Sequence, residues 1–224
     1  QAAYGQRAEI RSDRRQILLA TGNPTALVPV HIAAICGSMR GDNSYTRLAL
    51  ELALASAAHA GATVDLIDLA DFHLPLCSGP DDTDDNLQTQ EIKARVGAAQ
   101  GILLGSPEYH NSFSGVLKNA LDLMGGDEFR GKVFGLLGVA GGSAGAVNTL
   151  GHLRVVVRGV GGWSLPVQIS IPNVRHAFAD GKLVDKGLED RVRFLGRELV
   201  RFTRLHSMVP ELEHRLVEII DEDV

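Results

Sequence analysis

The segment ILLGSPEYHNSFSGVLKNALDL, residues 102–123, decides the fold of this 224-residue chain. It begins with an apolar run at residues 102–104, continues through a polar turn at residues 105–112, and opens a helix near Ser114. A buried strand that leads through a polar turn into a helix is typical of parallel sheets, which bind ligands at the carboxyl ends of their strands. The segment therefore predicts an α/β protein with a ligand crevice at that edge.

Two other strand-to-helix turns have the same layout. One covers residues 37–46 (GSMRGDNSYT) and the other covers residues 141–145 (GGSAG). Each turn lies about one strand-helix-strand period from the next, so a parallel sheet would bring all three to one edge. We expect them to form three walls of a single site.

The rest of the chain alternates between strand and helix patterns. Apolar runs predict five strands, at residues 30–36, 63–69, 101–105, 132–140 and 165–171. Helical patterns occupy residues 45–60 and 89–99, the segments after the second and third turns, and an amphipathic closing stretch at 187–206. Right-handed crossovers then predict a doubly wound, three-layer α/β sandwich with a five-stranded parallel sheet.

The bulk composition narrows the class of protein. Hydrophobic residues make up 45% of the chain and charged residues 22%, which suits a globular core. The net charge of −5, without a basic patch, argues against nucleic acid as a partner. The longest apolar run, residues 48–60, contains Glu51, Ser56 and His59 and is too short to span a bilayer. We expect a cytoplasmic protein that binds neither nucleic acid nor membrane.

Neither the cysteines nor the histidines predict a metal site. Cys36 lies inside an apolar strand, where we expect a buried thiol, and Cys77 lies in a loop. The histidines lack the spacing of metal ligands. We interpret the acidic run at residues 81–85 as a solvated loop rather than a cation site.

We divide the chain into three parts. Residues 1–29 form an N-terminal extension, for which partial disorder is one interpretation, residues 30–206 form one domain, and residues 207–224 form a C-terminal tail. Three origins of the extension stay open: a native segment, an expression remnant, or a processed targeting remnant. The last would place the protein in an organelle.

The first turn has the features of a phosphate site. It leads to a helix N-terminus, where unpaired backbone N–H groups and the helix dipole favour an anion. Ser38, Ser44 and Thr46 add hydroxyl groups, and Arg40 adds a forked positive charge. The turn matches neither the P-loop nor the dinucleotide-binding glycine pattern. A simpler interpretation, in which Ser44 only caps the helix, stays open.

The other two turns suit a flat ring. Pro107 is stiff, Tyr109 is aromatic, and the surrounding backbone amides could hydrogen-bond to the edge of a ring. The glycines of the third turn would let the backbone come close to a ligand, although they could also serve only to end the preceding strand.

Three segments carry a family resemblance: GSMRGDNSYTRLAL, SPEYHNSFSGVLKNALD and GGSAGAVNTLGHLR. They resemble the NADPH-dependent FMN reductase family, whose members have a flavodoxin-like fold and include quinone, azo-dye and chromate reductases and arsenical-resistance flavoproteins. The resemblance covers roughly residues 30–175, and its second segment is the most specific. It implies FMN as cofactor, NADPH as electron donor, a small-molecule electron acceptor, and a homodimer or homotetramer.

The resemblance also assigns cofactor-binding residues in each turn. The FMN-phosphate loop matches Ser38, Arg40, Ser44 and Thr46, with Tyr45 inside it at a position where Asn is common. The loop under the isoalloxazine ring matches Pro107, Glu108, Tyr109, Asn111 and Ser112, and Phe113 follows where a small residue or Pro is usual. The loop at the pyrimidine end of the ring matches Gly141, Gly142, Ser143 and Gly145.

The implied chemistry belongs mostly to the cofactor, so we expect no catalytic side chain. Hydride would pass from NADPH to N5 of FMN and then to a quinone, a flavin, an azo compound or an oxyanion such as chromate. Two alternatives stay open: a flavodoxin-like electron carrier and a flavin-based redox sensor. We expect His110 to face solvent, Arg154 or Arg158 to line a helix face or reach the cofactor, and Trp163 to serve in packing or an oligomer contact.

Overall fold

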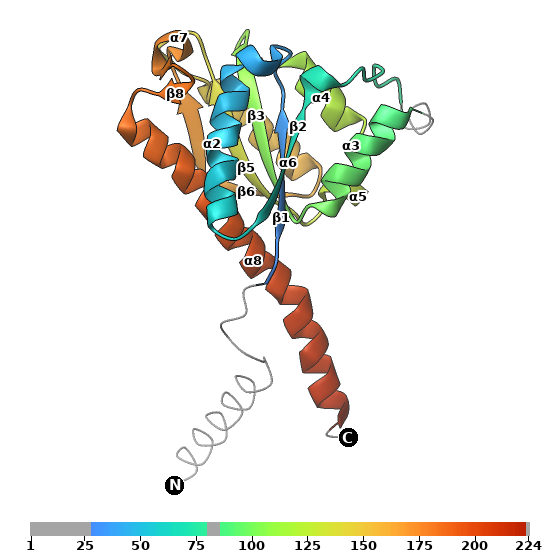
Figure 1. The fold of residues 1–224 in the computed structure, drawn as a ribbon. Coiled ribbons are helices and arrows are strands. Elements are labelled where there is room, and N and C mark those ends of the chain that lie inside the picture. Colours follow the sequence, from blue (N-terminus) through green and yellow to red (C-terminus); the bar gives the residue numbers. More distant parts are fainter. Residues whose placement is uncertain (1–27, 80–85, 223–224) are drawn as a thin grey trace.

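The computed structural model describes residues 28–79 and 86–222, with side chains up to residue 208. Its centre is a sheet of five parallel strands in the order β2-β1-β3-β5-β6 (Figure 1). The strands are β1 (His31–Cys36), β2 (Thr63–Asp68), β3 (Gly101–Tyr109), β5 (Val133–Val139) and β6 (Trp163–Ile171). The chain passes from β1 to β2 on one side and then returns to β3 on the other. A ligand crevice is expected at this switch point of a doubly wound sheet. The structure confirms the predicted flavodoxin-like α/β fold.

The second turn differs from the prediction. β3 continues to Tyr109, past the predicted end at residue 105, and pairs antiparallel with the short strand β4 (Ser112–Phe113). His110 and Asn111 join the two strands with φ angles of 51° and 63°, the left-handed conformation of a two-residue hairpin turn. The predicted polar turn is therefore a hairpin that projects from the strand end.

Helices cover both faces of the sheet. One face carries α2 (Tyr45–His59) and α8 (Lys186–Glu222). The other carries α3 (Leu87–Ala98), α4 (Gly115–Asp122), α5 (Gly126–Phe129) and α6 (Val147–Gly159). The 3₁₀ turns η1 (Gly41–Asn43) and η2 (Leu69–Asp71) follow β1 and β2, and the helix α7 (Val174–Ala177) with the hairpin β7 (Phe178–Ala179) and β8 (Lys182–Leu183) follows β6.

Alternate strand residues supply the two apolar layers. In β1, Ile32 and Ala34 belong to the cluster under α2 and α8, whereas Ala33 and Ile35 belong to the cluster under α3, α4 and α6. All four are fully buried. Burial on both faces explains why the strands read as continuous apolar runs, and hence why they were predictable.

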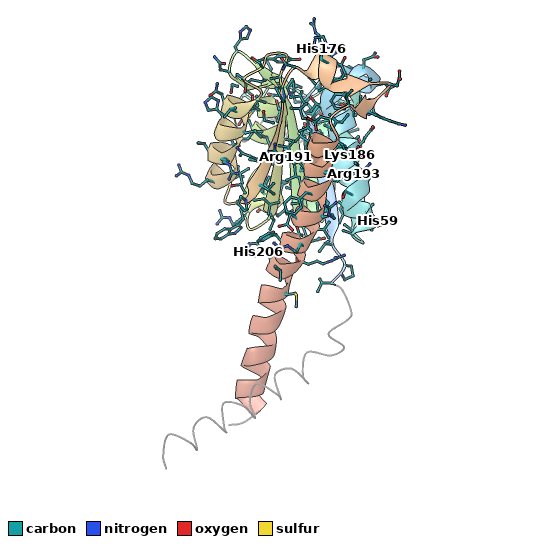
Figure 2. All side chains as sticks on the ribbon, turned by 90° about the vertical axis from the view of Figure 1, so that its left-hand side faces the viewer. His59, His176, Lys186, Arg191, Arg193 and His206 are labelled. Atoms are coloured by element: carbon teal, nitrogen blue, oxygen red, sulfur yellow. The ribbon has the colours of Figure 1, made fainter. Side chains whose placement is uncertain are left out.

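α2 and α8 pack with their backbones in close approach (Figure 2). Ser56 Oγ in α2 donates a hydrogen bond of 2.8 Å to the carbonyl of Arg193 in α8. A Cβ at Gly196 would overlap the carbonyl oxygen of Ala53, so only glycine fits at this crossing. This contact fixes α8 against α2.

α8 is longer than predicted. It does not end at residue 206 but continues to Glu222, so most of the predicted C-terminal tail is continuous with the closing helix. The reason is visible in the sequence: apolar residues recur every three or four positions beyond Phe202, at Leu205, Val209, Leu212, Leu216 and Ile219. The last part of α8 extends away from the body of the domain (Figure 1). In the part of the chain that the structure describes, no helix combines the length and apolar character needed to span a bilayer.

Candidate functional site

The three predicted turns meet at one crevice of about 170 Å³ at the carboxyl ends of β1, β3 and β5. Eight predicted site residues line it: Ser38, Arg40, Tyr45, Thr46, Pro107, Glu108, Tyr109 and Gly141. Val139, Val174 and Arg175 complete the lining. Val174 and Arg175 were not predicted, because they lie on α7 after β6 and outside the three turns that follow β1, β3 and β5.

The first turn ends at the N-terminus of α2. The side chain of Ser44 accepts a hydrogen bond of 3.2 Å from the N–H of Arg47, so Ser44 caps this helix and is itself buried. The N–H groups of Tyr45 and Thr46, in the first turn of α2, have no acceptor among the described residues. These N–H groups and the helix dipole make the N-terminus of α2 a favourable place for an anion.

Two residues of the first turn extend into a neighbouring hollow. Arg40 and Tyr45 line both the crevice and an open hollow of about 490 Å³ that also touches Asp42 and Gly181. The ring of Tyr45 stacks on Phe178 with their centroids 5.3 Å apart. Tyr45 thus attaches the β7–β8 segment to the crevice.

Buried serines join the first turn to the second. Ser114 Oγ donates a hydrogen bond of 2.6 Å to the carbonyl of Gly37 and accepts one of 3.3 Å from Leu117 N–H, which caps α4. Ser106 Oγ accepts a hydrogen bond of 2.9 Å from the N–H of Ser114 and donates one to the carbonyl of Pro107. The N–H of Gly37 donates in turn to the carbonyl of Gly105 at 2.8 Å. Sequence reasoning assigned no role to Ser106, because its partners come together only in the folded chain.

Glu108 joins the second turn to the third. Its Oε2 accepts a hydrogen bond of 3.0 Å from the N–H of Thr149 in the first turn of α6. The N-cap residue of α6 is Ala146, which has no side chain to cap the helix. Glu108 supplies the missing acceptor, and its negative charge is favourable at this end of a helix.

The third turn is shaped by its glycines, of which Gly141 lines the crevice. The carbonyl of Gly142 accepts hydrogen bonds from Asn173 and Gly145. Gly145 has a φ of 70°, and a Cβ there would overlap the hydroxyl of Ser170. That hydroxyl accepts a hydrogen bond of 2.8 Å from Ala146 N–H. Gly142, Ser143 and Gly145 do not line the crevice, and Ser143 is exposed.

Asn111 and Ser112 lie on the hairpin between β3 and β4, outside the crevice lining. Ser112 Oγ lies 3.0 Å from Nδ1 of His152, and Oδ1 of Asn111 lies 3.5 Å from the side-chain amide of Asn148. Both contacts connect the hairpin to α6. His110, at the turn of the hairpin, is exposed as predicted.

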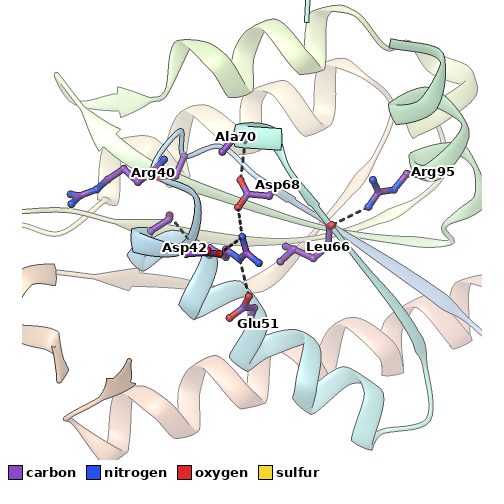
Figure 3. A network of polar contacts seen from close by, with 10 residues as sticks. Arg40, Asp42, Glu51, Leu66, Asp68, Ala70 and Arg95 are labelled. Carbon is purple, nitrogen blue, oxygen red and sulfur yellow. Dashed lines mark hydrogen bonds and ion pairs between the residues drawn. The ribbon is translucent and has the colours of Figure 1, made fainter. Parts of the chain in front are cut away.

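An ion-pair network connects the first turn to neighbouring elements (Figure 3). Arg47 pairs with Asp42 at 3.0 Å, with Glu51 at 2.9 Å and with Asp68 at 3.3 Å. The hydrogen bond to Glu51 raises the pKa of Arg47 above its usual value. The Asp68 carboxylate, at the end of β2, is buried and also accepts from Ala70 N–H. The network therefore ties the start of α2 to the end of β2.

Cys36 lies under the same turn and is unreactive in this environment. Burial, reinforced by the negative charge of Asp68, raises the pKa of its thiol to about 12. The thiol therefore stays protonated near neutral pH. Cys36 is fully buried, as predicted. Across the described ranges, no cluster of His, Cys, Asp or Glu could hold a metal ion.

Arg154 and Trp163, two residues left open by the sequence, lie away from the crevice. The Arg154 guanidinium donates hydrogen bonds to Gln168 Oε1 at 2.6 Å and to the carbonyl of Leu165 at 2.8 Å, and both of these acceptors belong to β6. Trp163 is 63% exposed, and its ring lies edge-on to that of His206 in α8, with the ring centroids 5.6 Å apart.

The geometry agrees with a comparison of the chain with known proteins. A family model described as NADPH-dependent FMN reductase matches residues 30–176. The chain belongs to this family. The match ends within α7, so β7, β8 and α8 lie beyond the part that defines the NADPH-dependent FMN reductases.

Several relatives found by sequence comparison are named azoreductases. The NADPH azoreductase of Bacillus sp. (strain OY1-2) is 39% identical over 119 residues, which cover 53% of this chain and 66% of that protein. The FMN-dependent NADPH-azoreductase of Staphylococcus saprophyticus subsp. saprophyticus is 42% identical over 113 residues, covering 48% of this chain and 58% of that protein. The matched part thus spans less than two thirds of either relative.

Solved structures agree in fold. FerB, a flavoenzyme NAD(P)H:(acceptor) oxidoreductase from Paracoccus denitrificans, superimposes with a TM-score of 0.63 at 21% identity, covering 79% of this chain and 98% of that one. The apo form of the NADH:FMN oxidoreductase EMOB gives a TM-score of 0.60 at 24% identity, covering 76% of this chain and 90% of that one. At these identities the likeness is one of fold alone.

Proposed function

We propose that this protein is an FMN-dependent oxidoreductase that takes hydride from NADPH and reduces a small-molecule acceptor. One observation carries the proposal: a helix N-terminus with unpaired N–H groups, an arginine and an aromatic-rimmed hairpin converge on the same crevice. Membership of the NADPH-dependent FMN reductase family supports the choice of cofactor and donor.

The first turn fits the phosphate of FMN. The N–H groups of Tyr45 and Thr46 and the side chains of Ser38 and Arg40 offer donors at the start of α2. A phosphate monoester is a dianion with several acceptor oxygens, which such a set of donors can neutralise and hydrogen-bond. Ser44 contributes indirectly, because as the N-cap it fixes the start of the helix.

The second and third turns suit the ring. Pro107 lines the crevice with a stiff ring and Tyr109 with an aromatic ring, and Gly141 lets the backbone approach without a side chain. When bound, FMN supplies the hydride-accepting and electron-donating chemistry. The chain orients its ligands and excludes water from one side. The Glu108 carboxylate accepts from Thr149 N–H, so it holds α6 in place rather than acting as a general base.

Among acceptors, azo compounds are our first proposal, because the relatives named above are azoreductases. Quinones, free flavins and oxyanions such as chromate are further candidates for the same exposed cofactor face. The crevice is open on the side of Arg40 and Tyr45, where the larger hollow begins, so an acceptor can approach from there.

We also propose that the protein acts in the cytoplasm as a homodimer or homotetramer. Exposed apolar side chains support self-association: Trp163 at the start of β6 is 63% exposed, and Leu205 and Met208 in α8 are 51% and 41% exposed. Light scattering coupled to gel filtration would measure the assembly, and a monomer at micromolar concentration would contradict it.

The test of the function is a visible spectrum of protein that has been mixed with FMN and desalted, recorded before and after anaerobic addition of NADPH. We expect the flavin to stay with the protein and to lose its absorbance promptly on addition of NADPH, and then to be reoxidised by an azo dye. Retained flavin that stays oxidised would instead indicate an electron carrier or a sensor. Protein that neither retains FMN nor shows FMN-stimulated NADPH oxidation would refute the proposal.

A further inference from the structure

Arg175 brings a second guanidinium group to the crevice. It lies on α7, directly after β6, whereas Arg40 comes from the turn after β1. Both side chains are exposed and both line the same crevice. Two cations from distant parts of the chain therefore meet at one small site, and only the first of them belongs to the three predicted turns.

Among the residues that the structure describes, neither arginine has a carboxylate partner. Arg47 and Arg95 form ion pairs with carboxylates, but no carboxylate within residues 28–79 and 86–208 pairs with Arg40 or Arg175. Among the described lining residues, only Glu108 carries a carboxylate, and Thr149 N–H already donates to one of its oxygens. The crevice thus carries more positive than negative charge, in a chain whose net charge is −5.

The segment that carries Arg175 is held in place. The N–H of Val174 donates to the carbonyl of Ala140 at 2.9 Å, at the end of β5. Asn173 N–H donates to the carbonyl of Gly142 in the third turn, and Phe178 stacks on Tyr45 in the first. Arg175 therefore belongs to a wall of the site that is fixed to two of its turns.

We propose that Arg175, together with Arg40, binds a phosphate group of the ligand. The inference rests on the proposed function and extends it to a residue outside the three turns. Two guanidinium groups at one crevice repel each other, and an anion between them removes that repulsion. Their forked N–H donors match the oxygens of a phosphate, which can accept from both. The phosphate could belong to FMN or to the nicotinamide dinucleotide.

The experiment compares Arg175→Gln and Arg175→Lys with the wild type. Arg158→Gln is the matched control, because Arg158 is an exposed arginine in the last turn of α6, at the other end of that helix from the crevice. Quenching of flavin fluorescence gives the dissociation constants of FMN and of riboflavin, which lacks the phosphate. Calorimetric titration of the FMN-loaded protein gives those of NADP⁺ and NAD⁺. Circular dichroism checks the fold of each variant.

Each source of phosphate has its own signature. If FMN supplies the phosphate, R175Q raises the FMN dissociation constant about tenfold and leaves that of riboflavin unchanged. If the dinucleotide supplies the phosphate, R175Q raises the dissociation constant of NADP⁺ by a similar factor and leaves that of FMN unchanged. The dissociation constant of NAD⁺ rises as well only if the group bound is the pyrophosphate, which both dinucleotides contain. R175K, which keeps the charge but not the fork, lies between R175Q and the wild type.

Two outcomes overturn the inference while the proposed function stands. In the first, wild-type protein binds FMN and is reduced by NADPH, but R175Q has the same four affinities as R158Q. In the second, R175Q weakens FMN and riboflavin equally, which would mean that Arg175 does not contact a phosphate. Wild-type protein that binds no FMN would instead remove the proposed function itself.

Discussion

Replacing Ser114 with Ala tests whether the first two turns are held together as the structure shows. Ser114 is buried at the start of α4, where its hydroxyl accepts from Leu117 N–H and donates to the carbonyl of Gly37. Loss of an N-cap costs about 1 kcal/mol. The buried carbonyl of Gly37 also loses its 2.6 Å hydrogen bond, and an unsatisfied buried group costs about 1–3 kcal/mol. We therefore expect the free energy of unfolding to fall by about 2–4 kcal/mol.

Urea denaturation followed by circular dichroism measures this change, since the midpoint falls while the slope stays the same. Ser143→Ala is the control, because Ser143 is exposed in the third turn and lies outside the crevice lining. FMN affinity should fall as well in Ser114→Ala, because Gly37, which loses its hydrogen bond, is the first residue of the phosphate turn. A Ser114→Ala protein that unfolds within about 0.5 kcal/mol of the wild type would refute the reasoning.

Three further predictions concern other parts of the molecule. Arg40→Ala should weaken FMN binding about tenfold in a fluorescence titration without changing the urea midpoint, because the side chain is exposed; unchanged affinity would remove it from the phosphate site. Gly196→Ala should destabilise the protein by about 1–3 kcal/mol in thermal unfolding, because the new Cβ would overlap the carbonyl of Ala53. An unchanged melting temperature would mean that α2 and α8 can move apart without cost. Arg95 lowers the pKa of Asp65 through hydrogen bonds of 2.7 and 2.8 Å, so this pair stabilises the fold above the unfolded pKa of about 3.9 and loses its effect as the pH falls through the lower folded value. Arg95→Gln should therefore be less stable than the wild type at pH 7, with the difference shrinking below about pH 4; a difference independent of pH would exclude an electrostatic cause.

The strands and the three turns were predictable because parallel strands are buried on both faces and leave apolar runs that stand out from the turns between them. The hairpin at His110 and Asn111 was not, because its turn lacks the glycine that usually marks a two-residue hairpin loop. Capping of α6 by Glu108 was also out of reach, since donor and acceptor are far apart in the sequence. The competing interpretations of Ser44 as a cap or as a ligand could be separated only by the position of its hydroxyl, which faces Arg47 N–H.

The site's lining was predictable only in part, for a related reason. In the first turn Ser38, Arg40, Tyr45 and Thr46 line the crevice as predicted, but Ser44 is buried as a helix cap and does not. In the second turn Pro107, Glu108 and Tyr109 line it, whereas Asn111 and Ser112 lie outside it on the hairpin. Arg175 carries no motif of its own. Its place at the crevice depends on the way in which the chain turns back after β6, which the hydrogen bonds of Asn173 and Val174 determine.

The hydrogen bonds between the turns limit how the site can be redesigned. Ser114 reaches from α4 to the turn after β1, and Glu108 reaches from β3 to the start of α6. A loop graft that changes acceptor preference by importing residues 105–112 alone would leave Thr149 N–H without its acceptor unless the donor loop also carries a carboxylate at position 108. Exchange of these turns between homologous enzymes should therefore succeed more often when the three are transferred as one cassette.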